Sequence, residues 1–558
     1  MQGGSEAMKR NAAVLLCAGL LVLMTRKGSG SENGSLSIPA EAARSPFGIE
    51  YVFPGRPGFH TEQTAETYKD IGAKWVKFQY CPWKMFEPNA PRDGTHTYTW
   101  QQMDNHVRWW QERGFQIQVC VKCLNEWAVQ DPKLHLFGYP PRLQEKKHLD
   151  LLKTHGASNA PKAAHRDDWM DFIGALVERY DGDGIDDMPG LRFPILYYES
   201  ESEAQHWTYW LGSLEDYAAT LKMLHKAAKE ACPEVRIILS GIELGGTARD
   251  GPDDEVMRQR RDAMLERLTP GQKVYFRNIS SFIEGSLALG DYYDIVEFHA
   301  LVDYTAIPGT AAYLRRKLAE LGYEKEIWAG DASSAPEVGT LASLFGGPEN
   351  YEGPRGRICR ILATPDDPEH AEIKAWYQRE QASLTVKKYI VAIEARLAKI
   401  FMASLEDWVG SPWPNHGLTN RDGTPRPVYR AIQFLTRTVD GFEDEKRLEL
   451  GEGIYAFQFV VGGNAVYVLW YELDQNQLDL PSSGDPAITV SLPVNASQAR
   501  VIDFDMMCKN SNVIGELRSA GNGAISLKLD RYPAFVKVSH ALDAAERRSA
   551  SQTAAQEF

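Results

Sequence analysis

The chain has 558 residues, a net charge of -14 and an aromatic share of 11%. This length leaves room for two or three domains. The acidic balance, without a Lys/Arg-rich run to neutralise phosphates, argues against nucleic acid as the partner. Aromatic faces offer stacking surfaces to a neutral polyol instead.

Residues 1–27 are predicted to be an export signal or an uncleaved membrane anchor. Lys9 and Arg10 precede an apolar core over residues 12–24, which is shorter than the roughly 20 residues of a membrane-spanning helix. Cys17 follows Leu16 rather than a small residue, so we assign it to the apolar core instead of a lipid attachment site. We expect a protein outside the cytoplasm, whether periplasmic, secreted or anchored, and a linker over residues 28–44.

Between residues 45 and 440, strand-like runs alternate with amphipathic helical stretches. The expected strands are 47–52, 75–79, 116–121, 194–198, 236–240, 295–299, 326–329 and 400–404. The expected helices include 61–71, 100–113, 169–180, 214–230, 311–321 and 379–397. Eight strands with intervening helices predict an α/β fold, the (β/α)8 TIM barrel, which keeps its chemistry at the carboxyl ends of its strands.

After residue 441 the pattern changes to short alternating runs separated by glycine- and proline-rich turns. The runs are 454–460, 465–471, 488–492, 499–504, 525–529 and 535–538. They predict a C-terminal antiparallel β-sandwich over residues 441–540. The polar tail, residues 541–558, is expected to be disordered.

Three carboxylates, Glu199, Glu201 and Glu203, stand at alternate positions directly after the fourth apolar run. On a strand this spacing places all three on one face. Crowded like charges raise one another's pKa, and a carboxyl that stays protonated near neutral pH can act as a general acid. Flanking aromatic residues favour a site over a solvated loop: Tyr197, Tyr198, Trp207, Tyr209 and Trp210. The row indicates acid/base chemistry on a sugar-like substrate.

Further motifs follow other strands in a fixed order. Trp83 opens a W-x-x-x-E-P motif after the second strand, Trp127 and Ala128 end the third, His299 ends the sixth, and residues 417–429 follow the eighth. This order, over about residues 45–538, resembles the clan-A glycoside hydrolases, particularly the xylosidase- and iduronidase-like group, with a barrel followed by a β-sandwich.

The resemblance implies roles for the residues after the fourth strand. The family's motif Y-x-E-x-x-N-E-P matches residues 197–204, so that Glu203 is the acid/base and Glu199 is a structural carboxylate inside the barrel. Glu201 is an addition to the motif. Ser202 stands where the family has asparagine and Ala204 where it has proline, which changes the contact expected with the sugar.

The resemblance also implies that Asp331, at the end of the seventh strand, occupies the position of the nucleophilic glutamate. Aspartate is shorter by about 1.5 Å. Since retaining enzymes hold their carboxyls roughly 5 to 5.5 Å apart and inverting ones about 6.5 to 9.5 Å, an unadjusted backbone would land near the inverting range. Retention with a shifted strand is favoured over inversion and over loss of activity. Glu297, Glu243 and Asp407 are fallback partners.

Residues at or beyond the other strand ends are candidates for contact with the substrate. Together with two residues of the carboxylate segment they are Glu201, Ser202, His299, Trp83, Trp127, Trp207, Tyr304 and Trp408. One or two of the tryptophans are expected to stack on sugar rings and the rest to lie in the core. His299 can hydrogen-bond the substrate or a catalytic carboxylate, and a structural histidine is an equal alternative.

No cofactor and no metal are expected. The segment from Asp181 to Asp187 has calcium-loop spacing but lacks the remaining EF-hand ligands, so a turn is favoured over structural calcium. Cys120 and Cys123 form a CxxC without a second ligand pair, which favours buried thiols over zinc or redox chemistry. The sequence predicts a glycoside hydrolase acting on an oligo- or polysaccharide. The alternatives are a non-catalytic glycan-binding protein and, more weakly, a hydrolase of another bond.

Overall fold

The computed structural model describes residues 35–131, 157–334, 354–407, 416–472 and 486–538, except 57, 59, 245, 246, 250, 252, 267–269 and 302. The predicted signal, the tail over residues 541–558 and Trp408 lie outside the described residues. Across the described part of the chain, no helix combines the length and apolarity needed to cross a membrane.

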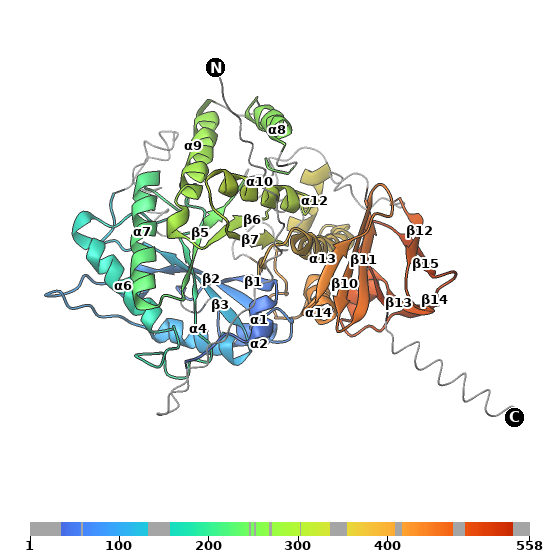
Figure 1. Cartoon of the computed structure of the whole chain (residues 1–558), viewed down its shortest axis with the longest axis horizontal. Coiled ribbons are helices and arrows are strands. Elements are labelled where there is room, and N and C mark those ends of the chain that lie inside the picture. Colours follow the sequence, from blue (N-terminus) through green and yellow to red (C-terminus); the bar gives the residue numbers. More distant parts are fainter. Residues whose placement is uncertain are drawn as a thin grey trace, which may run out of the picture.

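Eight parallel strands close into a barrel in chain order, which confirms the predicted TIM barrel (Figure 1). They are β1 (Phe47–Val52), β2 (Trp75–Pro82), β3 (Gln116–Lys122), β4 (Tyr197–Ser200), β5 (Arg236–Ile242), β6 (Ile295–His299), β7 (Glu326–Ser333) and β8 (Ile400–Ala403). The barrel closes where Phe47 of β1 pairs with Ile400 of β8. The chemistry expected of this fold therefore belongs at the end reached by His299 and Asp331.

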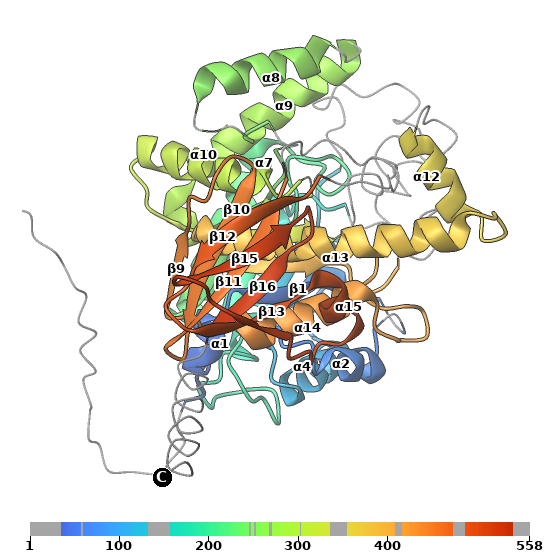
Figure 2. The same cartoon turned by 90° about the vertical axis from the view of Figure 1, so that its right-hand side faces the viewer.

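Helices cover the outside of the barrel. They are α1 (Ala40–Arg44), α2 (Glu62–Tyr68), α3 (Trp83–Phe86), α4 (Gln101–Glu112), α6 (Arg166–Glu178), α7 (Leu214–Ala231), α8 (Asp254–Glu266), α9 (Pro270–Leu287), α10 (Ala306–Glu320), α12 (Pro354–Ala363), α13 (His370–Glu394) and α14 (Pro427–Val439). Helix α7 begins where Ser213 and Asp216 cap each other's backbone amides. Figure 2 shows α8 at the outer edge of the molecule, whereas α9 joins the barrel cluster through Ile283 and Leu287; the periodicity predicted neither of these helices after β5.

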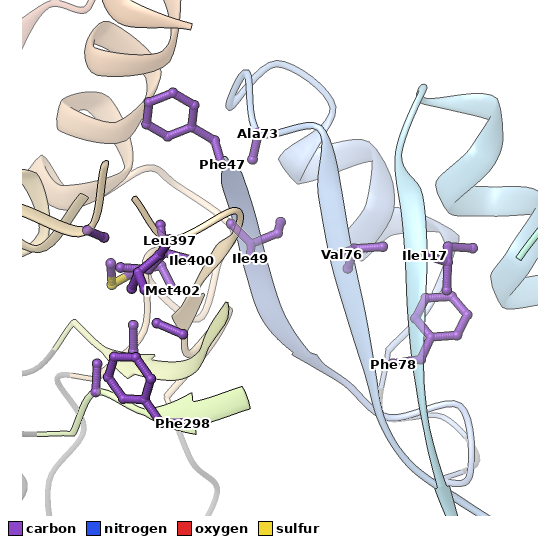
Figure 3. Packing of buried hydrophobic residues seen from close by; sticks show 14 of the residues in the cluster. Phe47, Ile49, Ala73, Val76, Phe78, Ile117, Phe298, Leu397, Ile400 and Met402 are labelled. Atoms are coloured by element: carbon purple, nitrogen blue, oxygen red, sulfur yellow. The ribbon is translucent and has the colours of Figure 1, made fainter. Parts of the chain in front are cut away.

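Side chains that point outward from the strands, among them Ile49, Val76, Phe78 and Ile117, join the helices in one hydrophobic cluster (Figure 3). Inside, the amino-terminal end is filled by an apolar layer of Trp75, Ile238, Ile295, Trp328 and Phe401. Helix α1, the last part of the segment expected to be a linker, lies against this end, because the Trp75 indole donates to the carbonyl oxygen of Ala42 at 2.7 Å. The floor of the barrel is thus closed.

The C-terminal part is an antiparallel β-sandwich, as predicted. Its larger sheet has the order β14-β13-β16-β11-β10-β9, and β12 pairs with β15 in a smaller sheet. The strands are β9 (Asp444–Arg447), β10 (Ile454–Val461), β11 (Asn464–Tyr471), β12 (Ile488–Pro493), β13 (Gln498–Ile502), β14 (Glu516–Ser519), β15 (Ala524–Leu529) and β16 (Ala534–Val538), with helix α15 (Phe504–Lys509) between β13 and β14. The sequence missed β9 and β14, because these edge strands are charged and do not alternate.

The larger sheet is buried on both faces. Ile454 and Ala456 of β10 face the smaller sheet, whereas Phe457 and Phe459 join the cluster that includes the barrel. Figure 1 shows α13 and α14 between the barrel strands and this sheet. The sandwich is consequently packed firmly against the barrel rather than tethered to it.

Candidate active site

Strained backbone collects at the carboxyl end of the barrel. Nine non-glycine residues among those described have positive φ, and five of them lie at these strand ends: Tyr51 (74°), Tyr80 (57°), Glu201 (64°), Glu203 (46°) and Asp331 (39°). Left-handed backbone is costly for residues with a side chain, and it persists where the surroundings enforce it, commonly at functional sites. The strain independently indicates this end as the functional one.

The three carboxylates after the fourth strand do not share a face, which corrects the prediction. Strand β4 ends at Ser200, and the left-handed residues Glu201 and Glu203 break the alternation that a strand would impose. Glu199 points into the barrel, where it pairs with Lys77. Glu201 turns toward a neighbouring loop, and of the three carboxylates Glu203 is the one that hydrogen-bonds His299.

A buried layer around Lys77 fills the middle of the barrel. The Lys77 ammonium lies 2.8 Å from Glu199 and 3.6 Å from Glu50, and it also donates to Glu297; all four side chains are fully buried. Burial lowers the pKa of Lys77, but the three carboxylates outweigh this effect and hold its pKa well above the usual range. Burial raises the pKa of Glu199 to about 7 and that of Glu50 to about 8. Glu199 and Glu50 therefore keep their protons to a higher pH than ordinary carboxyls do.

Above this layer, His299 joins the ends of strands β4, β6 and β7. Its Nδ1 lies 2.6 Å from Oε1 of Glu203 and 4.0 Å from Oδ2 of Asp331. The ligand atoms of Glu203, His299 and Asp331 all lie within 4.8 Å of one another. The structure thus brings together the two predicted catalytic carboxylates, with the predicted histidine between them.

Side chains from β1 hold Asp331 in place. The Tyr51 hydroxyl donates to Oδ2 of Asp331, and the Asp331 amide donates to the Glu50 carboxylate. A Cβ at Gly241 would lie 2.0 Å from Nε2 of His299, so only glycine leaves room for this ring. Tyr51, Glu50 and Gly241 could not be predicted as site residues, because no sequence motif marks the end of β1 and glycine has no side chain that would suggest a role.

The electrostatics differ from the sequence-based expectation. Burial raises the pKa of Glu203, but the charge and hydrogen bond of His299 outweigh this and lower its pKa overall. Burial lowers the pKa of His299, yet Glu203 and Asp331 together raise it to about 10. Burial raises the pKa of Asp331. The carboxylate row does not raise the pKa of Glu203, because Glu199 pairs with Lys77 and Glu201 turns away.

The separation of Glu203 and Asp331 matches retaining glycosidases better than inverting ones, since their nearest described oxygens lie within 4.8 Å. The pairing of β7 with β8 is irregular between Ala329 and Ala332, and Asp331 is left-handed within this irregularity. Bulges of this kind re-aim a side chain next to active sites.

An aromatic wall borders the carboxylates. Tyr80 and Tyr209 lie with ring centroids 5.9 Å apart, and Tyr51 and Phe53 join Tyr80 in a small cluster. The buried Lys122 ammonium lies 4.6 Å from the Tyr80 centroid and 5.3 Å from that of Tyr209. Tyr209 is one of the aromatic residues that flank the three carboxylates in the sequence, whereas no motif predicted Tyr80 or Lys122 as site residues. Faces of this kind suit stacking on a sugar ring.

Several predicted substrate contacts lie elsewhere. Trp83 is fully buried against Trp169 and Phe172, and its indole donates to Glu87, so the prediction that it contacts a substrate is wrong. Trp127 packs edge-on against Trp83 at 4.8 Å. Both tryptophans follow strand ends but turn outward under the helices.

Two further candidates, Tyr304 and Glu201, also have other partners. The Tyr304 hydroxyl donates to Glu472 of the sandwich at 2.8 Å, which argues against a substrate contact. Glu201 accepts from the Cys123 amide at 2.6 Å and from the Ser158 hydroxyl, and it is buried away from Asp331.

Two candidates remain near the site. Ser202 is buried and accepts from Gln79 at 3.3 Å inside the barrel mouth. Trp207 is half-buried and packs against Ala157 and Leu211. A contact of either residue with substrate stays a prediction.

The fallback carboxylates and the loop motifs have structural partners. Glu297 pairs with Lys77, Asp407 lies 2.6 Å from Arg426, and Glu243 lies 3.7 Å from His206. In the segment of residues 181–187, carboxylates accept from backbone amides, as a turn requires. Cys120 and Cys123 are free and buried, as predicted, and burial raises the pKa of both thiols.

No protein-family model matches the chain, and no curated protein matches it. Among solved structures, it is similar to a family 39 glycoside hydrolase from the gut symbiont Bacteroides cellulosilyticus WH2, with 14% identity, a TM-score of 0.54, and coverage of 89% of this chain and 82% of that one. It is also similar to a monomeric beta-xylosidase from Caulobacter crescentus CB15, with 12% identity, a TM-score of 0.51, and coverage of 90% and 97%. At these identities the likeness shows the fold, a TIM barrel followed by a β-sandwich, in agreement with the resemblance found in the sequence.

Proposed function

We propose that the protein is a glycoside hydrolase that cleaves an O-glycosidic bond of an oligo- or polysaccharide with retention of configuration. The observation that carries this proposal is the pair Glu203 and Asp331, whose oxygens lie within 4.8 Å at the mouth of the barrel. Of two carboxyls at about this separation, one can attack the anomeric carbon while the other protonates the glycosidic oxygen that leaves. The aromatic wall of Tyr80 and Tyr209 would receive the sugar ring.

The strand positions of Glu203 and Asp331 suggest which of them is the acid/base and which is the nucleophile. The resemblance gives Glu203, after β4, the task of acid/base and Asp331, on β7, that of nucleophile. The electrostatics of the free site by themselves favour the reverse, because the pKa of Glu203 is lowered and that of Asp331 is raised. We favour the positional assignment, since a bound sugar displaces water and changes both pKa values, whereas the strand positions stay fixed.

The proton for the leaving group can be held by Glu203 and His299 together. With the pKa of His299 raised to about 10, its Nδ1 donates to Oε1 of Glu203 in the free protein. When a glycosidic oxygen approaches Glu203, the same proton can move onto the carboxyl and then to the leaving oxygen. Asp331, oriented by the Tyr51 hydroxyl, would attack the anomeric carbon.

A non-catalytic glycan-binding protein is the alternative, because Ser202, Ala204 and Asp331 depart from the family's motifs. We also infer that the protein acts outside the cytoplasm, as the basic and apolar pattern before residue 25 indicates.

The test is a panel of aryl glycosides of several sugars, with the anomeric configuration of the first product followed by NMR. Turnover with a retained product supports the proposal. An inverted product would give Asp331 the task of activating water instead. Glycan binding without turnover on any glycoside, natural oligosaccharides included, would favour the binding protein.

A further inference from the structure

Helix α13 carries two pairs of adjacent buried polar residues, Glu380 with Gln381 and Lys387 with Lys388. The helix lies between the barrel and the sandwich (Figure 1). Burying four such side chains in one helix is costly unless each finds a partner. Their partners fall into two groups.

The first member of each pair binds the sandwich. Glu380 accepts from Arg531 at 2.9 Å and from the Tyr532 hydroxyl. Lys387 donates to Glu472, which follows β11, at 2.7 Å. Burial raises the pKa of Glu472, but Lys387 and its other partners outweigh this and lower its pKa, so Glu472 carries its charge near neutral pH.

The second member of each pair binds loops at the catalytic end of the barrel. Lys388 donates to the carbonyl oxygens of Ala300 and Ser333, the latter at 2.8 Å. Ala300 directly follows His299, and Ser333 lies two residues after Asp331. The Gln381 amide donates to the Ser334 hydroxyl at 3.0 Å and to the His416 carbonyl at 3.0 Å, beyond β7 and β8.

Helix geometry explains the division. Adjacent residues of an α-helix point about 100° apart, and residues seven apart return to nearly the same direction. Glu380 and Lys387 therefore share one face, and Gln381 and Lys388 share the next. The face of α13 that binds the sandwich and the face that binds the loops are thus carried by adjacent residues of one buried helix.

We propose that the sandwich acts as a brace for the active site: through Glu472 and Lys387 it fixes α13, and through Lys388 it positions the strand ends that carry His299 and Asp331. This inference rests on the proposed function, because it makes Lys388 and Glu472 positioning residues of that site. Neither touches the reacting atoms. The sandwich thereby contributes to catalysis by holding the strand ends in position.

The experiment compares Lys388→Met and Glu472→Gln in the full chain, with Glu516→Gln as the matched control. Glu516 is an exposed carboxylate of β14 paired only with its neighbour Arg518 among the described ion pairs, so this variant makes the same chemical change in the sandwich without touching α13. We measure kcat and KM on the best aryl glycoside and hydrogen exchange of the segments at residues 299–301 and 331–334.

Both test variants should speed exchange at these segments, and the control should not. Lys388→Met should lower kcat about tenfold to a hundredfold with little change in KM, since a misplacement of about 1 Å has this cost. Glu472→Gln should lower kcat less, in the same direction. Unchanged exchange at both segments in both variants would overturn the brace, as would faster exchange with unchanged kcat. If the wild-type protein shows no turnover, the proposed function fails, and the exchange measurement still decides whether the sandwich holds the strand ends.

Discussion

The barrel interior contains two layers in which one cation is surrounded by carboxylates, and the two layers differ in how far they are exposed to solvent. In the middle layer, Lys77 is surrounded by Glu50, Glu199 and Glu297, and every one of these side chains is fully buried. In the upper layer, His299 lies between Glu203 and Asp331, whose side chains remain 11% and 12% exposed. The middle layer around Lys77 is thus closed to solvent, whereas the upper layer around His299 is open to a ligand.

This difference in exposure determines what the side chains of each layer can do. The middle carboxylates are bound to Lys77, Gln118 and backbone amides, so they hold the strands together and have no freedom to react. The upper carboxylates are positioned by neighbours that leave one side open, which is the arrangement that catalysis requires. Changes in the upper layer should affect rates and spare folding, whereas changes in the middle layer should affect folding most.

The largest effect is expected from Asp331→Asn. The amide is nearly the same size and can still accept from Tyr51, but it cannot attack an anomeric carbon. Activity should fall by orders of magnitude for every leaving group, while the thermal unfolding curve stays close to that of the wild type. Steady-state kinetics measure the loss of activity, and thermal unfolding followed by circular dichroism checks that stability is unchanged. An active Asp331→Asn variant would remove Asp331 from the mechanism and direct attention to Glu243.

The next effect concerns the middle layer. Lys77→Met leaves three buried carboxyls without their cation, and breaking a buried pair in this way costs about 3–5 kcal/mol of unfolding free energy. Urea unfolding measures the loss. Lys69→Met is the matched control, because Lys69 pairs with Glu66 on the exposed surface and its removal should change stability little. Equal losses in the two variants would show that the middle layer does not carry the stability assigned to it.

A smaller and more selective effect is expected from Glu203→Gln. Loss of the general acid should slow substrates with poor leaving groups about 10²- to 10⁴-fold and slow the first step on activated aryl glycosides much less. Rates across aryl glycosides of graded leaving-group pKa give this dependence. Glu201→Gln, the same change two residues away, should cost much less, because Glu201 binds Cys123 and Ser158 instead of His299.

The same series tests the assignment of roles. If Asp331→Asn, rather than Glu203→Gln, shows the steep leaving-group dependence, the two carboxylates exchange roles, as the pKa directions of the free site suggest. Equal losses in Glu201→Gln and Glu203→Gln would mean that the residues after β4 act as a coupled group.

The sequence predicted the barrel, the sandwich, and the meeting of Glu203 with Asp331, because strand periodicity and the order of strand-end motifs are local properties. It failed where closure of the barrel bends the backbone. Alternation places Glu199, Glu201 and Glu203 on one face, but left-handed residues at the strand end send them in three directions. Such bends depend on contacts between strands, which a local pattern does not contain.

The aromatic residues near strand ends also point in directions that a local pattern does not predict. Trp83 and Tyr80 lie three residues apart around the end of β2, yet the irregular pairing of this strand turns Tyr80 toward the site and leaves Trp83 in the core. Tyr304 follows β6 as a site residue would, but the docked sandwich supplies Glu472 as its partner. A residue's place after a strand predicts which end of the barrel it occupies and leaves its direction open.

A further effect is expected in the pH dependence of stability in Glu50→Gln. Burial raises the pKa of Glu50 from 4.5 to about 8, so the folded protein binds more protons than the unfolded chain between these values. The contribution of Glu50 to stability is therefore complete below pH 4.5 and is lost as the pH rises through about 8. Glutamine does not titrate and can still accept from the Asp331 amide, so the variant's unfolding free energy should fall less over this range. Urea midpoints for both proteins at several pH values measure the difference, and parallel curves would show that Glu50 is already ionised in the middle layer.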